Sequence, residues 1–81
     1  MRHIVSDRIV SDPGVCGGEP CIQGTRILVE VVLDNLAAGM TWDDLVDDLP
    51  GLTRDDIAAA LRFASRSIRS WEEIELEAQA G

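Results

Sequence analysis

The sequence predicts a mainly α fold, in which a short N-terminal β-hairpin arm precedes a three-helix core with a long last helix. Glycine and proline gather before residue 28, apolar residues recur at helical spacing after it, and a twelve-residue repeat marks two helix starts. A chain of 81 residues has the length of one domain. Within this domain we assign residues 1–27 to the arm and residues 28–81 to the helical part.

The arm is expected to contain two short strands. Ile9 and Val10 begin the first strand, which ends at the Asp-Pro-Gly turn over residues 12–14. Residues 21–23 form the second strand, with glycines on both sides. Glycine and proline in this segment let the two strands fold back tightly on each other.

Two strands alone are only marginally stable in water, so we expect the arm to pair with a second copy of the chain. The residues expected at this dimer contact are Ile9, Val10, Cys21, Ile22, Arg26 and Ile27. We expect Arg26 to tie the arm to a carboxylate or to the last carbonyls of a helix. The tetrapeptide "IVSD" occurs at 4–7 and again at 9–12, an echo too short to predict a structural repeat.

The first helix is predicted from "ILVEVVLDNLAAG". Its apolar stripe, at helical spacing, is Val29, Val32, Leu33 and Leu36. Gly39 is a natural C-terminal stop, since glycine readily adopts the left-handed backbone conformation. Leu28 and Val31 widen the apolar stripe, and this surplus is typical of a helix that a partner covers.

The repeat pairs "MTWDDLVDDL" at 40–49 with "LTRDDIAAAL" at 52–61. Thr41 and Thr53 are expected to cap two helices, with an aspartate three positions later completing each capping box. Two capped helices joined by a Leu-Pro-Gly turn are typical of a helix-turn-helix motif. Two capped helices in a small bundle that binds nothing fit the pattern as well.

The last helix is predicted from about residue 54 to about residue 78. Its apolar stripe is Ile57, Leu61, Ala64, Ile68 and Trp71. A basic face lies opposite, formed by Arg62, Arg66 and Arg69. With Thr53 and Arg54, these arginines are the candidate DNA-binding residues. A solvated face with helix-internal ion pairs explains the same arginines.

The tail "WEEIELEAQAG" is acidic and amphipathic, which favours a partner-binding segment. Its candidate partner-binding residues are Trp71, Glu72, Glu73, Ile74 and Leu76. A frayed and solvated helix end is the alternative.

The composition excludes several function classes. The net charge is −8, so DNA contact requires a local basic face, whereas a basic protein partner suits the whole surface. One histidine and two cysteines are too few for a zinc site, and no nucleophile lies at a suggestive spacing from a base, so we expect no enzyme, no metal and no cofactor. Neither a signal peptide nor a membrane span is evident, so we expect a cytoplasmic protein.

Two blocks of the sequence, "DPGVCGGEPCIQGTRI" and "AAGMTWDDLVDDLPGLTRDDIAAALRFA", together resemble the small prokaryotic domain-of-unknown-function family 433. The resemblance covers about residues 8–65 and implies a helix-turn-helix, homeodomain-like fold behind a β-hairpin arm. Members of the family resemble VapB-type antitoxins. The resemblance therefore implies an antitoxin that neutralises a PIN-like nuclease toxin, in a complex that represses its own operon by binding operator DNA. A dimeric protein-interaction module without DNA binding is the alternative, which the net charge favours.

Overall fold

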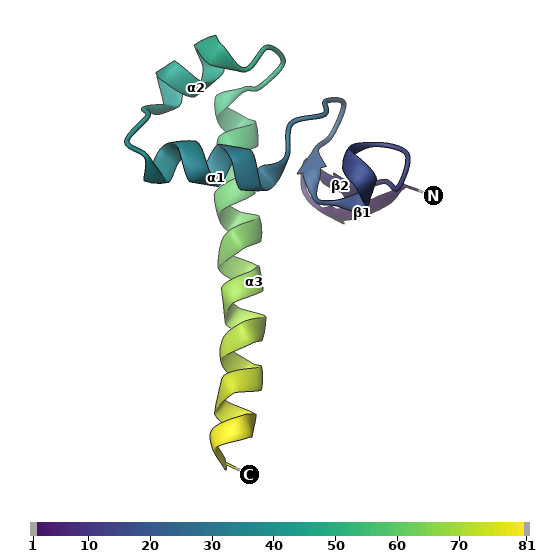
Figure 1. Ribbon diagram of the computed structural model, residues 1–81, viewed down its shortest axis with the longest axis vertical. Coiled ribbons are helices and arrows are strands. Elements are labelled where there is room, and N and C mark those ends of the chain that lie inside the picture. The colour runs from purple at the N-terminus through teal and green to yellow at the C-terminus, as the bar shows by residue number, and fades with distance from the viewer. Residues whose placement is uncertain (1, 81) are drawn as a thin grey trace.

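Three strands and three helices follow one another along the described part of the chain (Figure 1). This computed structural model of the protein describes the backbone of residues 2–80 and the side chains of residues 2–69. The strands are β1 His3–Ser6, β2 Ile9–Ser11 and β3 Cys21–Ile22; a 3-10 turn spans Cys16–Gly18; and the helices are α1 Val29–Ala37, α2 Trp42–Asp48 and α3 Arg54–Ala80. The mainly helical architecture predicted from the sequence is confirmed.

The N-terminal sheet has three antiparallel strands in the order β1-β2-β3, and the expectation of a two-stranded arm was wrong. The strand that was not expected is β1, which lies in the first "IVSD" segment. Ile4 of β1 pairs with Val10 of the second "IVSD" segment, so the two copies of this tetrapeptide form a β-hairpin. The pairing register shifts between Ile4 and Ser6, and this irregularity breaks the alternation by which a strand is predicted. Arg8 follows in the turn with a φ of 66°.

The sheet lies against the helices and shares their core. Ile9 and Ile22 face each other across β2 and β3, and both are fully buried. They belong to one cluster that also contains Val29, Val32, Leu45, Leu52, Ile57, Ala59 and Ala60. The N-terminal segment is therefore a wall of the core, because its apolar face is covered by the chain's own helices.

The helix boundaries follow the local signals in the sequence. Val29 and Val32 are buried on α1, and Gly39 follows the helix with a φ of 99°, which a residue with a Cβ rarely adopts. Thr41 caps α2 in a complete capping box with Asp44. The three helices pack against one another, and α3 also contacts β2.

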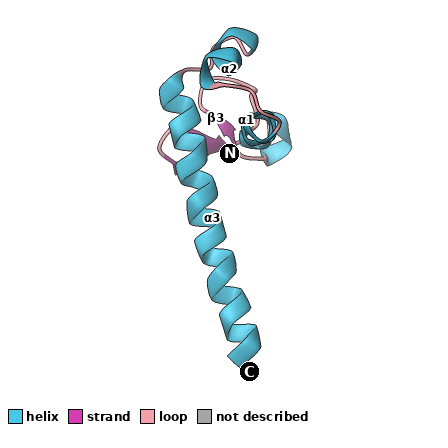
Figure 2. Cartoon of the chain, turned by 90° about the vertical axis from the view of Figure 1, so that its left-hand side faces the viewer, coloured by secondary structure: helices cyan, strands magenta, loops and turns pink. Residues whose placement is uncertain are grey.

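Helix α3 extends far beyond the sheet and the other two helices (Figure 2). Helix α1 packs against the N-terminal half of α3, and the C-terminal half of α3 extends away from the core. No helix in the described part of the chain combines the length and the apolar character that crossing a bilayer requires.

Candidate functional site

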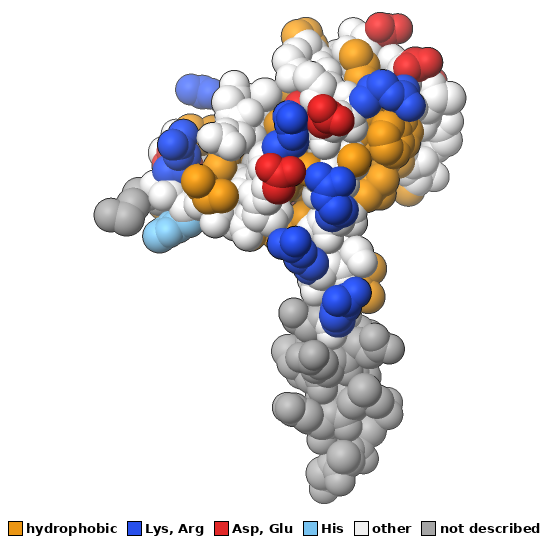
Figure 3. Space-filling model, turned by 180° about the vertical axis from the view of Figure 1, so that it is seen from behind, with side chains coloured by type: hydrophobic (Ala, Val, Ile, Leu, Met, Phe, Trp, Pro, Cys, Tyr) orange, Lys and Arg blue, Asp and Glu red, His pale blue; other side chains and the backbone are white. Residues whose placement is uncertain are grey.

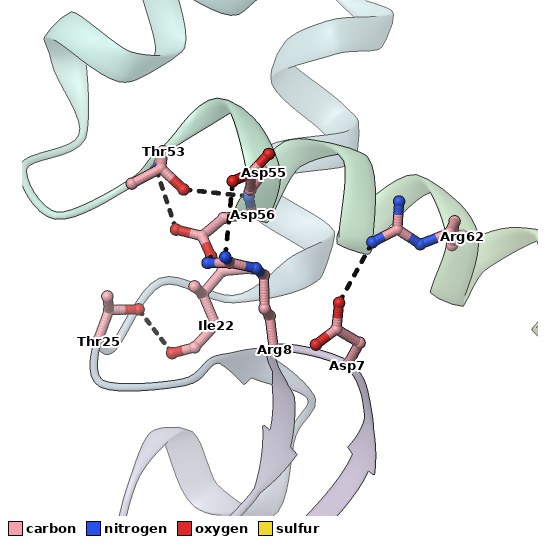
Figure 4. Close-up of polar contacts among 8 residues, drawn as sticks. All are labelled: Asp7, Arg8, Ile22, Thr25, Thr53, Asp55, Asp56 and Arg62. Carbon is pink, nitrogen blue, oxygen red and sulfur yellow. Dashed lines mark hydrogen bonds and ion pairs between the residues drawn. The ribbon is translucent and has the colours of Figure 1, made fainter.

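The start of α3 is held by an ionic cluster that reaches it from the β1–β2 turn (Figure 4). The Thr53 N–H donates to Oδ2 of Asp56 at 3.0 Å, and the Asp56 N–H donates to the Thr53 hydroxyl at 3.2 Å, so the expected capping box is formed. Arg8 donates from Nη1 to Oδ1 of Asp56 at 3.2 Å and lies 3.6 Å from a carboxylate oxygen of Asp55. Thr53 and Asp56 are thus occupied by contacts within the chain.

Arg54 is also engaged within the chain. Its guanidinium donates to Asp43 at 2.8 Å and lies 5.0 Å from the ring centre of Trp42 on α2. Both Asp43 and Asp55 expose more than four fifths of their side chains beside this arginine. The N-terminal turn of α3 therefore presents mostly negative charge to solvent.

The basic face predicted on α3 is present as an arginine strip, which we define as Arg62, Arg66 and Arg69. Figure 3 shows basic side chains, which in this lysine-free sequence are all arginines, along the part of the helix whose side chains are described. Arg62 lies 3.5 Å from Asp7 of the β1–β2 turn. Within the described residues, no carboxylate lies within 4.0 Å of Arg66 or Arg69.

An apolar groove lies between α1 and α3, on the side of α3 opposite the arginine strip. Its volume is about 390 Å³. The apolar lining of this α1–α3 groove, which we call its floor, consists of Pro20, Leu28, Val29, Leu33, Phe63, Ala64 and Ile68, and Ser67 lines it too. Three exposed acidic residues, Glu19, Glu30 and Asp34, complete the lining, and we call them its rim. Ile68 is 64% exposed, so the apolar stripe of α3 leaves the core and becomes surface here.

The candidate dimer residues of the arm lie mostly inside the chain. Ile9, Val10, Cys21 and Ile22 are buried, and Ile27 is half-buried against the core. Arg26 is exposed, and the described residues place no carboxylate within 4.0 Å of it. The tie expected from Arg26 to a carboxylate or to the last carbonyls of a helix therefore stays a prediction. Among the described residues, Arg8 makes the ionic link from the N-terminal segment to α3.

Comparison with known families matches residues 9–64 to the model described as "Protein of unknown function (DUF433)". The chain belongs to the DUF433 family. Among solved structures, the chain is similar to a DUF433 member protein from Anabaena variabilis ATCC 29413, with 30% identity and a TM-score of 0.71. That match covers 85% of this chain and 68% of the other. A search of curated proteins found no match.

The residues matched to the DUF433 model include only part of each candidate surface, the arginine strip and the α1–α3 groove. The match includes Arg54, Arg62 and most of the α1–α3 groove, and it ends before Arg66 and Arg69. The predicted tail residues Trp71, Glu72, Glu73, Ile74 and Leu76 lie outside the residues whose side chains are described. No cluster of three potential metal ligands occurs within the described residues.

Sequence reasoning missed the acidic rim of the groove and the role of Arg8. The surplus apolar residue Leu28 was a signal for the groove, because it lines the floor; Val31, the other surplus residue, is partly exposed outside it. No local signal pointed to Arg8, because its partners lie about fifty positions away.

Among the described residues of this DUF433 chain, two ionisable groups have shifted pKa values. Hydrogen bonds from the Thr41 backbone N–H and hydroxyl lower the pKa of Asp44. Burial, followed by the neighbouring Cys16, raises the pKa of the Cys21 thiol, which keeps it protonated and a poor nucleophile.

The Asp44 shift predicts a pH dependence of stability. Because folding lowers this pKa, the contribution of the capping box is fully present above the pKa of the unfolded aspartate and is lost as pH falls through the folded value. The loss is expected below about pH 4. Carboxyl-detected NMR should show Asp44 titrating below the ordinary range, and titration at or above that range would contradict the capping geometry.

Proposed function

We propose that this chain is the antitoxin of a toxin–antitoxin pair and acts by binding a PIN-like nuclease toxin rather than by catalysis. The observation that supports a protein-binding role is the α1–α3 groove, which leaves the apolar side chains of Leu28, Leu33 and Ile68 open to a partner. Contiguous apolar surface on a small protein commonly marks an interaction site. The toxin as partner comes from the family resemblance described above.

Co-expression tests this proposal. The small reading frame next to the gene should arrest growth when expressed alone, and co-expression of the wild-type chain should restore growth. Purification of the tagged chain should recover the neighbour's product in a complex. A neighbour that is harmless, or whose toxicity the chain does not relieve, would refute the antitoxin function.

Operator DNA is a second candidate ligand, which the arginine strip favours. The order α2, turn, α3 agrees with a helix-turn-helix, whose second helix places its first residues against base edges. In this chain that position carries exposed Asp55, and Arg54 is bound to Asp43. Carboxylates at this position would repel the DNA phosphates. We therefore propose that any DNA contact is made by the arginine strip to phosphates, and that the start of α3 does not read bases.

This proposal predicts the effect of removing two strip arginines. Combined Arg66→Ala and Arg69→Ala substitutions should weaken binding to all duplex sequences alike and lower the slope of log K against log salt by about 2. Arg54→Ala, the control, should leave that slope unchanged. Fluorescence anisotropy with unrelated duplexes at low salt measures both. No binding by the wild-type chain would leave a protein-interaction module without a DNA role.

We also propose that the chain forms a homodimer, and that β1 makes the contact. β1 is an edge strand, and within the described residues no strand pairs with its outer side. Ile4, at 68% exposure, continues a row of cross-strand neighbours formed by Val10 and Cys21. The segment Ile-Val-Ser already pairs with its own echo inside the chain, so the same segment of a second copy fits this edge.

A four-residue edge buries little area, so this dimer should be weak and concentration-dependent. In sedimentation velocity, the wild-type chain should shift from monomer to dimer as its concentration rises. Ile4→Asp should remove the shift, whereas Val31→Asp, a partly exposed control on α1, should keep it. A wild-type chain that stays monomeric, or equal behaviour of the two variants, would rule out this interface.

A further inference from the structure

The α1–α3 groove combines an apolar floor with a rim of one charge sign. Glu19, Glu30 and Asp34 are exposed at its edge, and none of its described lining residues is basic. Carboxylates beside an apolar, low-dielectric wall focus a negative potential into the groove. A segment that buries apolar side chains there must therefore bring positive charge to the rim, or it meets uncompensated repulsion.

Among the described residues, no arginine lies within 4.0 Å of the rim carboxylates of Glu19, Glu30 and Asp34. Arg8, Arg54 and Arg62 form ion pairs with aspartates elsewhere in the molecule. Arg66 and Arg69 lie on the face of α3 roughly opposite the groove residues, given about 100° per residue. The rim acids thus remain available to cations from outside the chain. A second copy is a poor occupant of this groove, because the rim is itself acidic and the copy's net charge of −8 adds to that local repulsion.

The shape of the groove indicates what kind of segment it fits. The described part of its floor runs between two packed helices and includes the exposed Ile68. A volume of about 390 Å³ lies within the usual range for ligand sites and fits a few large side chains. An amphipathic helix can lay such anchors into a groove from positions i, i+3 or i+4, and i+7.

We propose that the α1–α3 groove receives an amphipathic helix of the partner protein, whose apolar face is flanked by arginine or lysine. This inference rests on the proposed function, because it names the part of the partner that the chain binds. The apolar anchors contact Leu33, Phe63 and Ile68. The flanking cations lie against Glu30 and Asp34 and set both the orientation of the helix and its rate of association.

Two synthetic peptides test the groove directly. Both carry the same leucine stripe at helical spacing; one has arginines beside the stripe, and its twin has glutamates. In NMR titrations of the full chain at low salt, the arginine peptide should bind at least tenfold more tightly and shift the signals of Leu33, Phe63 and Ile68. Added salt should reduce the difference. Equal affinities, no binding, or shifts confined to the arginine strip would overturn the inference.

Charge reversal provides the matched variants. Combined Glu30→Lys and Asp34→Lys substitutions change exposed side chains, and they should invert the preference toward the glutamate peptide. Asp47→Lys with Asp48→Lys, on exposed positions of α2 outside the groove lining, should leave the preference for the arginine peptide in place. If the rim variant keeps the wild-type preference, the rim does not select the partner.

Growth rescue separates this inference from the proposed function. Loss of rescue by the rim variant, with rescue kept by the α2 control, supports both. Rescue by the wild-type chain and by both variants refutes the groove as the toxin site and leaves the antitoxin function standing. If the wild-type chain itself fails to rescue, the antitoxin function falls, and the peptide titrations alone decide what the groove binds.

Discussion

Replacing Ile9 by alanine should destabilise the protein by about 2–5 kcal/mol, the usual cost of truncating a buried isoleucine. Ile9 is fully buried in the core cluster, and its side chain lies between the sheet and the helices. A small domain has a total stability of only about 5–15 kcal/mol, so this single change removes a large part of it. Urea unfolding followed by circular dichroism measures the loss.

Ile4→Ala is the matched control for this substitution. Ile4 begins the other "IVSD" segment and lies in the adjacent strand, but it is 68% exposed. Its truncation should change the free energy of unfolding by about 0.5 kcal/mol or less when measured at low protein concentration. Similar losses for the two variants would mean that the sheet does not form a wall of the core.

Asp56→Ala should cost about 1–3 kcal/mol, because two kinds of contact disappear together. The start of α3 loses its capping box, so the Thr53 N–H loses its acceptor. Arg8 loses its closest carboxylate, and with it the main polar link between the β1–β2 turn and α3. Thermal and urea unfolding measure the change in stability.

Asp44→Ala separates capping from this long-range link. Asp44 completes the same capping box at the start of α2, but no arginine contacts it among the described residues. Its loss should therefore be the smaller one. Arg8→Ala in the Asp56→Ala background should add little, since the two side chains act on each other. If the two aspartate variants lose equal stability, the Arg8 contact contributes nothing to folding.

The helices of this fold could be predicted because their signals are local. Thr41 and Thr53 cap through residues three positions away, and Gly39 ends α1 through its own backbone conformation. Strand β1, the strand that the sequence did not predict, lacks such a local signal. Its pairing register is irregular at Val5, and its partner was recognisable only as a short echo of its own sequence.

The two candidate surfaces, the arginine strip and the α1–α3 groove, also differ in whether a local sequence signal predicts them. The arginine strip follows from helical spacing, so Arg62, Arg66 and Arg69 were found from the sequence. The α1–α3 groove exists only because two helices pack together, which brings Glu19 and Asp34 to the edge of one apolar floor. Sequence reasoning placed the dimer contact on Ile9 because it could not foresee that this side chain is buried.

The contacts of the N-terminal hairpin also decide when it can fold during synthesis. Arg8 bonds to Asp56 across 48 positions, and Asp7 lies beside Arg62 across 55 positions. The hairpin is synthesised before the α3 residues that contact it. At roughly 5–20 residues per second, it waits several seconds with Ile9 unburied. During that interval the nascent chain exposes an apolar strand, the kind of surface on which chaperones act.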